Sequence, residues 1–398
     1  MHQLLHSRNL RILLILSAYG GFIAGSLNWF GPYLLGKLGG ATLIGVSYTS
    51  VLLLASISRI LGGAFADTIG RRRTIILSLT LRMLAIVPML LMGINIITAT
   101  VLILAFELTR FMGAPALSSM IYESTRRETI GRIYATLRLV PQASNVIGAI
   151  LIGFLAEINI FPQVFALLTL LVIALSTCLK ETLEINPQYR KTESFIKAIR
   201  KPIGKMCEGF KMLMVNSNLR MLMLVAGIME LTGFMSWIYI PILLSFRGMD
   251  PKVMGVVYGL TTLARSIGTA IAGHLVDRYG AYKTIIIDCL TSAPCWLIIA
   301  LTSDPCITAV AFITNEFIVF SPLAARIAIM DTVNKSIRGT VIGGFTSVIM
   351  LMGSVGVALG SVLYNITPSL PFLITGIVWI GIAILVYSRL PLKITLLH

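Results

Sequence analysis

Gly63-Ala-Phe-Ala-Asp-Thr-Ile-Gly-Arg-Arg-Arg73 has a counterpart about two hundred residues later, Gly273-His-Leu-Val-Asp-Arg-Tyr-Gly-Ala-Tyr-Lys283, and the aspartates of the two stretches are 210 residues apart. A second landmark is independent of the first. Trp29 and Trp237, each followed within four residues by a proline, are 208 residues apart. Landmarks that share nearly one offset predict a tandem repeat of about 200 residues, and such repeats in a membrane protein are typical of transporters.

The composition indicates that lipid is the solvent of most of the chain. Apolar residues make up 57% of the 398 positions, charged residues only 12%, and the mean hydropathy is +0.91. The chain contains long apolar runs of about 18 to 25 residues, which is enough to cross a bilayer. Such runs predict membrane-spanning helices, because lipid cannot satisfy free backbone groups. The fold class predicted is therefore an all-α integral membrane protein with twelve transmembrane helices in two six-helix repeats. The spans are expected at about 10–35, 43–66, 74–92, 97–119, 133–156, 161–179, 220–246, 252–276, 284–302, 306–329, 338–362 and 368–389.

The distribution of charge predicts the orientation of the chain. The net charge is +16, but the basic residues gather on one side of the predicted spans rather than on a nucleic-acid-binding face. Only Lys37, Arg247 and Lys252 fall on the other side. The positive-inside rule then places both termini and the middle loop in the cytoplasm, as expected of a multi-pass protein of the cell membrane. The first apolar run is too long for a cleavable signal peptide and takes part in the repeat.

The domain layout follows the repeat. Residues 1–179 form the first six-helix half, 180–219 a polar cytoplasmic linker, and 220–398 the second half. The five cysteines show no paired spacing and are interpreted as reduced. The four histidines are scattered, and no phosphate-binding loop or nucleophile–base pair is visible, so we expect no metal, no cofactor, no ATP hydrolysis and no enzymatic activity. A monomer is expected.

The repeated stretch resembles the motif Gly-x-x-x-Asp-(Arg/Lys)-x-Gly-(Arg/Lys)-(Arg/Lys) of the major facilitator superfamily, and the likeness in helix number and layout covers essentially the whole chain. The first copy has Thr68 where a basic residue is usual, and the second has Ala281 and Tyr282 in place of the paired bases. The resemblance implies a cytoplasmic latch that closes when the transporter faces outward. Gly63 and Gly273 are expected to permit close helix contact. The residues that match the motif are Gly63, Asp67, Gly70, Arg71 and Arg72 in the first copy and Gly273, Asp277, Arg278 and Gly280 in the second.

Ten charged side chains fall inside the predicted spans, where each is costly unless it faces a cavity or a partner. They are Arg59, Arg82, Arg110, Arg138, Arg265, Arg326, Glu107, Glu230, Asp288 and Glu316. The resemblance implies that the first, fourth, seventh and tenth helices line the pathway. Three of these helices carry a central acid, namely Glu107 on the fourth, Glu230 on the seventh and Glu316 on the tenth. These acids are the candidates for proton coupling. Glu230, for example, lies about 15 Å from the cytoplasmic end of its span.

The partners of these acids are predicted from spacing. Glu107 and Arg110 are three residues apart on one helix face, so a structural ion pair is as good an interpretation as a functional one. Glu230 and Glu316 have no basic neighbour within a turn, and Arg265 is the cation most within their reach. Because buried arginines outnumber buried acids, Arg82, Arg110 and Arg265 are candidates to bind a polar or anionic substrate.

The aromatic landmarks provide a further set of candidates on the first and seventh helices. Asn28, Trp29, Ser236, Trp237 and Tyr239 place an aromatic and a polar group on the pathway helix of each half. We expect them to contact substrate, with helix packing as the alternative interpretation.

The function predicted is that of a secondary transporter that moves a small polar or anionic solute by alternating access, with protons as coupling ion. One alternative is polyspecific efflux of lipophilic cations, because central acids and an apolar lining would serve that substrate class too. A second alternative, from another class, is a non-transporting membrane sensor, because a fold does not determine a function.

Overall fold

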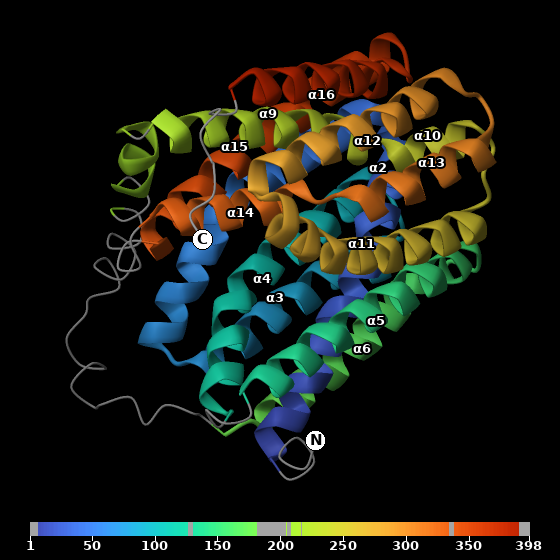
Figure 1. Ribbon diagram of the computed structural model, residues 1–398. Helices are drawn as coiled ribbons and strands as arrows, with labels where there is room; N and C mark the ends of the chain where they lie inside the picture. Colours follow the sequence, from blue (N-terminus) through green and yellow to red (C-terminus); the bar gives the residue numbers. More distant parts are fainter. Residues whose placement is uncertain are drawn as a thin grey trace. The chain divides into compact units, whose positions relative to one another are not determined.

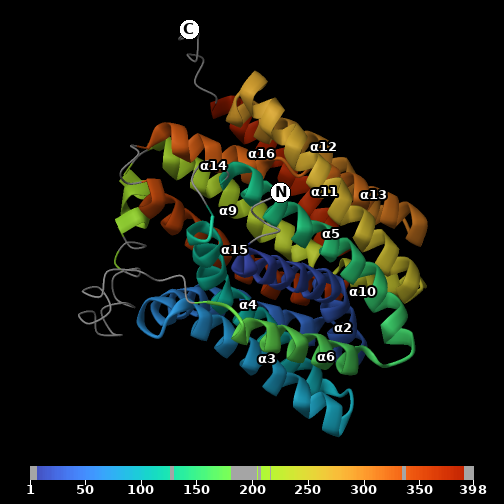
Figure 2. The same ribbon diagram turned by 90° about the horizontal axis from the view of Figure 1, so that it is seen from below.

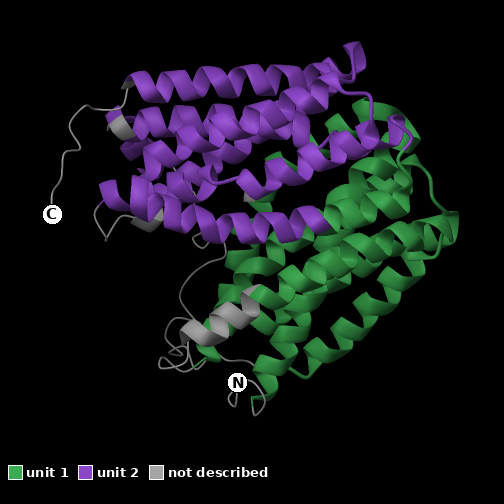
Figure 3. Ribbon diagram, turned by 45° about the vertical axis from the view of Figure 1, so that its right-hand side comes forward, with its two compact units in different colours: residues 1–204, 249–259 green, residues 205–248, 260–398 purple. Residues whose placement is uncertain are grey.

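The computed structural model describes residues 7–125, 130–180, 204, 208–215, 217–333 and 338–389. Within these ranges the regular structure is helical (Figure 1). The linker predicted at 180–219 lies largely outside the described residues, and so does the side chain of Arg138. The chain divides into two compact units, residues 1–204 with 249–259 and residues 205–248 with 260–398 (Figure 3).

The first unit contains five helices that provide six spans. They are α2 (Arg8–Thr68), α3 (Arg71–Met92), α4 (Ile96–Glu123), α5 (Ile130–Glu157) and α6 (Phe161–Thr177). The 61-residue α2 is two spans, because Gly39 and Gly40 leave helical geometry in its middle. Gly40 has φ +67°, a conformation that glycine adopts without the penalty of a Cβ.

The second unit contains the counterparts of these helices, two of them broken. Its elements are α9 (Ser217–Trp237), α10 (Ile240–Phe246), α11 (Pro251–Tyr279), α12 (Ala281–Leu301), α13 (Pro305–Ile318), α14 (Ser321–Thr332), α15 (Arg338–Ile366) and α16 (Leu370–Arg389). The first turns of α11, up to residue 259, belong to the first unit. The spans predicted as continuous at 220–246 and 306–329 are each interrupted. A proline opens the second piece in both cases, because its ring fits the first turn of a helix but not the interior.

Packing within each unit repeats as the sequence predicts. In the first unit α3 lies against α4 and α6, and α2 lies against α5 (Figure 2). In the second unit α12 lies against α13, α14 and α16, and α9 lies against α15. The tandem repeat is thus a repeat of packing as well as of sequence.

Nine helical segments of the described chain are long and apolar enough to cross a membrane. One of them, α2, provides two spans, while α9 with α10 and α13 with α14 each provide one. The shorter apolar α6 and the charge-bearing α11 occupy the two remaining places in the repeat. The twelve-span interpretation is confirmed, and the chain is a multi-pass membrane protein.

A buried carboxylate holds the break between α13 and α14. The Oδ2 atom of Asp288 on α12 accepts hydrogen bonds from the backbone amides of Phe320 (3.0 Å) and Ser321 (2.6 Å) and from the Ser321 hydroxyl. Its Oδ1 atom accepts one from Ser292 (2.9 Å), and the side chain is fully buried. The first amides of a helix have no intrahelical acceptor, so a neighbouring helix supplies one here. The sequence marks Asp288 only as a charge within a span.

Replacing Asp288 by alanine is expected to lower the thermal stability of the protein strongly. The change leaves the Phe320 and Ser321 amides buried without an acceptor, at a cost of about 1–3 kcal/mol for each. Asp288→Asn keeps one acceptor oxygen and should lose less. Melting curves in detergent for both variants test this order, and equal melting temperatures for wild type and Asp288→Ala would show that the cap contributes nothing.

Candidate functional site

An ion pair in the second unit joins a buried glutamate to a half-exposed arginine. Glu316 on α13 is only 3% exposed, whereas the side chain of Arg265 on α11 is 50% exposed. The Nε atom of Arg265 donates to Oε2 of Glu316 at 2.5 Å, and a second guanidinium nitrogen contacts the same oxygen. The indole Nε1 of Trp237 donates to Oε1 at 3.1 Å. Both carboxylate oxygens therefore have a donor, and the predicted contact between Arg265 and Glu316 is present.

Glu230 belongs to the same electrostatic environment. It lies on α9 seven residues before Trp237, which is two helical turns along the same face. The positive charges that act on it are those of Arg265 and Arg326. Arg265 therefore influences two carboxylates, but it is hydrogen bonded to only one of them in this conformation. Its guanidinium also lies 5.9 Å from the ring centre of Trp237.

The first unit contains a related pair on a single helix. Arg110 and Glu107 of α4 approach to 2.5 Å, with Glu107 buried and Arg110 40% exposed. The guanidinium of Arg110 also lies over the ring of Phe111. The i,i+3 ion pair expected from spacing is therefore present.

The two buried glutamates occupy equivalent places in the repeat, a relation that the sequence analysis missed. Asn95 caps the start of α4 and Asp304 caps the start of α13, each by accepting hydrogen bonds from the next backbone amides. The caps are 209 residues apart, and so are Glu107 and Glu316. Aligning the cap residues would have revealed this correspondence from sequence alone. Both halves therefore have a buried glutamate at this position. Its partner arginine lies on the same helix in the first unit and on another helix in the second.

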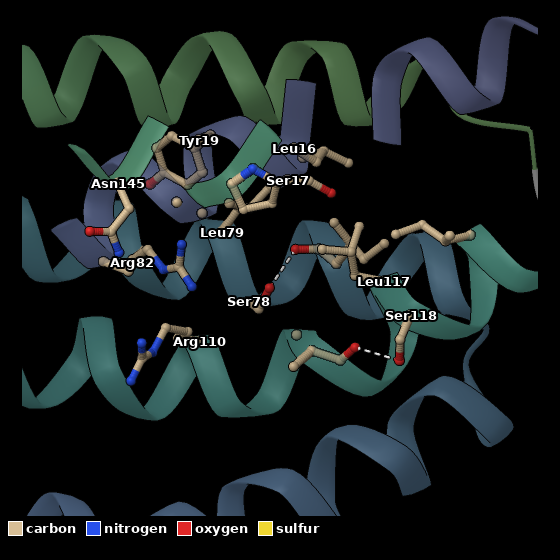
Figure 4. Close-up of a pocket in the computed structure, with 18 of the residues that line it drawn as sticks. Leu16, Ser17, Tyr19, Ser78, Leu79, Arg82, Arg110, Leu117, Ser118 and Asn145 are labelled. Carbon is tan, nitrogen blue, oxygen red and sulfur yellow. Dashed lines mark hydrogen bonds between the residues drawn. The ribbon is translucent and has the colours of Figure 1, made fainter. Parts of the chain in front are cut away.

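Arg82 on α3 lies in a pocket of the first unit with a volume of about 440 Å³ (Figure 4). Its side chain is 6% exposed, and its Nε atom donates to the Thr109 hydroxyl at 3.0 Å. The guanidinium lies 5.7 Å from the ring centre of Tyr19 and 5.5 Å from that of Phe106. In the part of the chain that the structure describes, no carboxylate forms an ion pair with Arg82.

Most of the aromatic landmarks have packing partners. Trp29 is fully buried, donates to the Ala149 carbonyl at 3.1 Å and stacks on Tyr258. Asn28 beside it is half-buried. Ser236 is hydrogen bonded to Thr375 (2.7 Å) and Tyr239 donates to the Val357 carbonyl (2.7 Å). Of these landmark residues, Trp237 is the one that contacts the ion pair of Arg265 and Glu316.

The repeated motif forms the same turn twice. Gly70 precedes α3 with φ +97°, and Gly280 precedes α12 with φ +81°. Side chains other than glycine rarely adopt this conformation, which explains why both copies of the motif have glycine there. Asp67 and Asp277 lie in the last turns of the preceding helices, α2 and α11.

The basic residues of the motif are held within their own units. Arg71 forms an ion pair with Glu123 at the end of α4, and Arg72 donates to the Thr177 carbonyl at the end of α6. Arg278 lies over the ring of Tyr279. Within its own unit, a Cβ at Gly63 or at Gly273 would meet no described atom within 4 Å, so close helix contact at these glycines stays a prediction.

Comparison with known proteins agrees with this architecture. The family model described as Major Facilitator Superfamily matches residues 12–325 and 222–394. Similar solved structures include the nucleoside transporter NupG (TM-score 0.75, 12% identity) and a D-xylose–proton symporter (0.68, 14%). The human organic anion transporter MFSD10 is also similar (0.62, 16%), and each of the three alignments covers 96% of this chain and 98% of the other. No curated protein matches the sequence. The chain belongs to the Major Facilitator Superfamily, and its fold is that of a secondary transporter.

Proposed function

We propose that this secondary transporter couples the movement of a small polar or anionic solute to protons, with Glu316 as the group that exchanges the proton. The observation that carries the proposal is the position of Glu316, which is buried and paired with a half-exposed arginine. A carboxylate deep in a membrane protein needs either a cation or a proton. The residue therefore has two stable states, one paired with Arg265 and one protonated.

Exposure of Arg265 makes the exchange between these states possible. Half of its side chain is accessible, so its guanidinium can turn toward a solute or toward Glu230, on which its charge already acts. Loss of the cation leaves Glu316 with the indole hydrogen bond of Trp237 alone. Because an uncompensated buried charge is strongly unfavourable, Glu316 takes up a proton at that moment. Solute binding and protonation thus become linked through one arginine.

The preference for a polar or anionic solute rests on the balance of buried charge. Arg82, Arg110 and Arg265 lie within spans, and Glu107 and Glu316 each neutralise one of the latter two. The fold accommodates such cargo in other proteins, since similar structures include a nucleoside transporter, an organic anion transporter and a sugar–proton symporter. We place the protein in the cell membrane with both termini in the cytoplasm, because basic residues gather on that side.

We also propose that the repeated motif is a cytoplasmic gate. Asp67 and Asp277 each precede a glycine turn of the same geometry. A carboxylate in the last turn of a helix is attracted to the positive N-terminus of a facing helix. This interaction is lost when the two halves separate. The ion pair of Arg71 with Glu123 and the hydrogen bond of Arg72 to the end of α6 keep the first copy rigid.

The test is uptake of labelled solutes into proteoliposomes that contain purified protein, with and without an imposed pH gradient. Pools of carboxylates, sugars, nucleosides, amino acids and lipophilic cations are compared. The proposal expects a pool of polar or anionic solutes to accumulate when the gradient is imposed and not without it. Efflux of lipophilic cations would be shown if only that pool moves and if Arg110→Ala and Arg265→Ala leave its transport intact.

A further inference from the structure

The surroundings of Arg82 differ from those of Arg110, Arg265 and Asp288. Arg110, Arg265 and Asp288 are each neutralised or fully hydrogen bonded within their units. Arg82 has five N–H donors, and the Thr109 hydroxyl accepts from one of them. The faces of Tyr19 and Phe106 add cation–π contact but accept no conventional hydrogen bond.

The described lining of the pocket in front of Arg82 carries a surplus of one positive charge. Among its described lining residues the charged side chains are Arg82 and Arg110, and none is acidic. Glu107 neutralises Arg110 from outside the lining. The remaining charge is that of Arg82, so a singly charged anion restores neutrality.

The rest of the pocket is largely apolar and has two distinct ends. Arg82, Arg110 and Asn145 lie together at one end (Figure 4). Leu117 is seven residues, or about 10.5 Å, further along α4 than Arg110. Leu16, Leu79 and Ile121 add to the apolar wall. A volume of about 440 Å³ is within the range of small-molecule sites.

We propose that this pocket binds a small amphipathic organic monoanion. Its carboxylate binds the guanidinium of Arg82, and its apolar body lies along the apolar wall toward Leu117. The proposal rests on the transport function proposed above and specifies its substrate class. Arginine suits this task because its planar fork donates two parallel hydrogen bonds to a carboxylate. Thr109, Tyr19 and Phe106 hold the fork in one orientation before the ligand arrives.

Binding to the purified protein in detergent tests the proposal without requiring transport. Isothermal titration uses four carboxylates, benzoate, phenylacetate, indole-3-acetate and octanoate, and the neutral amide of each. We expect at least one carboxylate to bind and its amide to bind at least about tenfold more weakly. In Arg82→Gln the affinity for that carboxylate should also fall by at least about tenfold, to that of the amide. Arg82→Lys, which keeps the charge but loses the fork, should be intermediate.

Two further variants separate binding from folding. Arg220→Gln removes an exposed arginine at the start of α9 and should bind like wild type. Leu117→Trp fills the apolar end without changing any charge and should abolish binding of the carboxylate. If Arg82→Gln fails to fold, Leu117→Trp and the preference of wild type for carboxylate over amide still decide the matter.

The proposal is overturned if no carboxylate binds wild type, if carboxylate and amide bind equally, or if Leu117→Trp or a folded Arg82→Gln keeps full affinity for the carboxylate. These outcomes are distinct from failure of the coupling mechanism. Coupling is measured as uptake with and without a pH gradient, whereas this site is measured as binding in detergent, where no gradient exists. A protein that moves solutes with protons but shows no effect of Arg82 on binding would keep the proposed function and lose this site.

Discussion

Glu316→Gln is expected to abolish the response of solute transport to a pH gradient while leaving exchange of solute for solute in place. Glutamine can accept the indole hydrogen bond of Trp237 but carries no exchangeable proton at this position. The difference in uptake with and without the gradient should therefore fall by about 100-fold or more, which corresponds to roughly 3 kcal/mol. Labelled-solute uptake and counterflow in proteoliposomes measure the two activities separately.

The matched control for this change is Glu157→Gln. Glu157 ends α5, is 55% exposed and pairs with Lys252 at 2.6 Å. An exposed pair contributes little, so this variant should transport like wild type. If Glu316→Gln keeps a full response to the gradient, Glu316 is a structural residue and another group carries the proton.

A second experiment changes Arg265, the partner of Glu316, and measures thermal stability. Arg265→Ala leaves a buried carboxylate without its cation, which costs about 3–5 kcal/mol when the acid stays charged. The double variant Arg265→Ala with Glu316→Gln removes both charges and should melt at a higher temperature than Arg265→Ala alone. A double variant less stable than either single one would show that the two residues do not act as a pair.

Gly21→Ala is expected to be a strongly disruptive small substitution in the first unit. A Cβ at Gly21 would lie 2.1 Å from the Pro141 carbonyl oxygen of α5, so the two helices must move apart. Overpacking typically costs about 1–3 kcal/mol, and a backbone obstacle places this change at the upper end of that range. The melting temperature in detergent should fall sharply, and so should the yield of monodisperse protein.

The neighbouring glycine provides the control. Gly20 is on the same helix, and a Cβ there would meet nothing within 4 Å. Alanine has the higher helix propensity, so Gly20→Ala should be neutral or slightly stabilising. Equal melting temperatures for the two variants would mean that α2 and α5 do not approach as closely as the structure shows.

Most of the fold could be predicted because repetition and apolar length are properties of the sequence itself. The offset of the motif and of Trp29 and Trp237 predicts two similar halves, and the packing confirms them. The breaks before α10 and α14 could not be placed in the same way. Their amides need acceptors from other elements, such as Asp288 of α12 for α14, and such a partner is not visible in a single apolar run.

The part of the candidate site that could be predicted is the depth of each charged side chain within the membrane, because it follows from the position of the residue along its helix. Counting residues places Arg265 and Glu316 at similar depth in their spans, and the structure shows that the two side chains meet. The environments of Ser236, Tyr239 and Trp29 did not follow, since their partners Thr375, Val357 and Ala149 lie far away in sequence. The isolation of Arg82 likewise becomes visible only when its neighbours on α2 and α4 are known.

In the proposed mechanism, solute movement and proton movement occur together through Glu316. The most direct test records the internal pH of proteoliposomes with an enclosed dye while an external solute is added without any imposed gradient. We expect a solute-dependent pH change in wild type and in Glu157→Gln, and none in Glu316→Gln. Solute uptake without a pH change in wild type would rule out proton coupling and would identify the protein as a uniporter or exchanger.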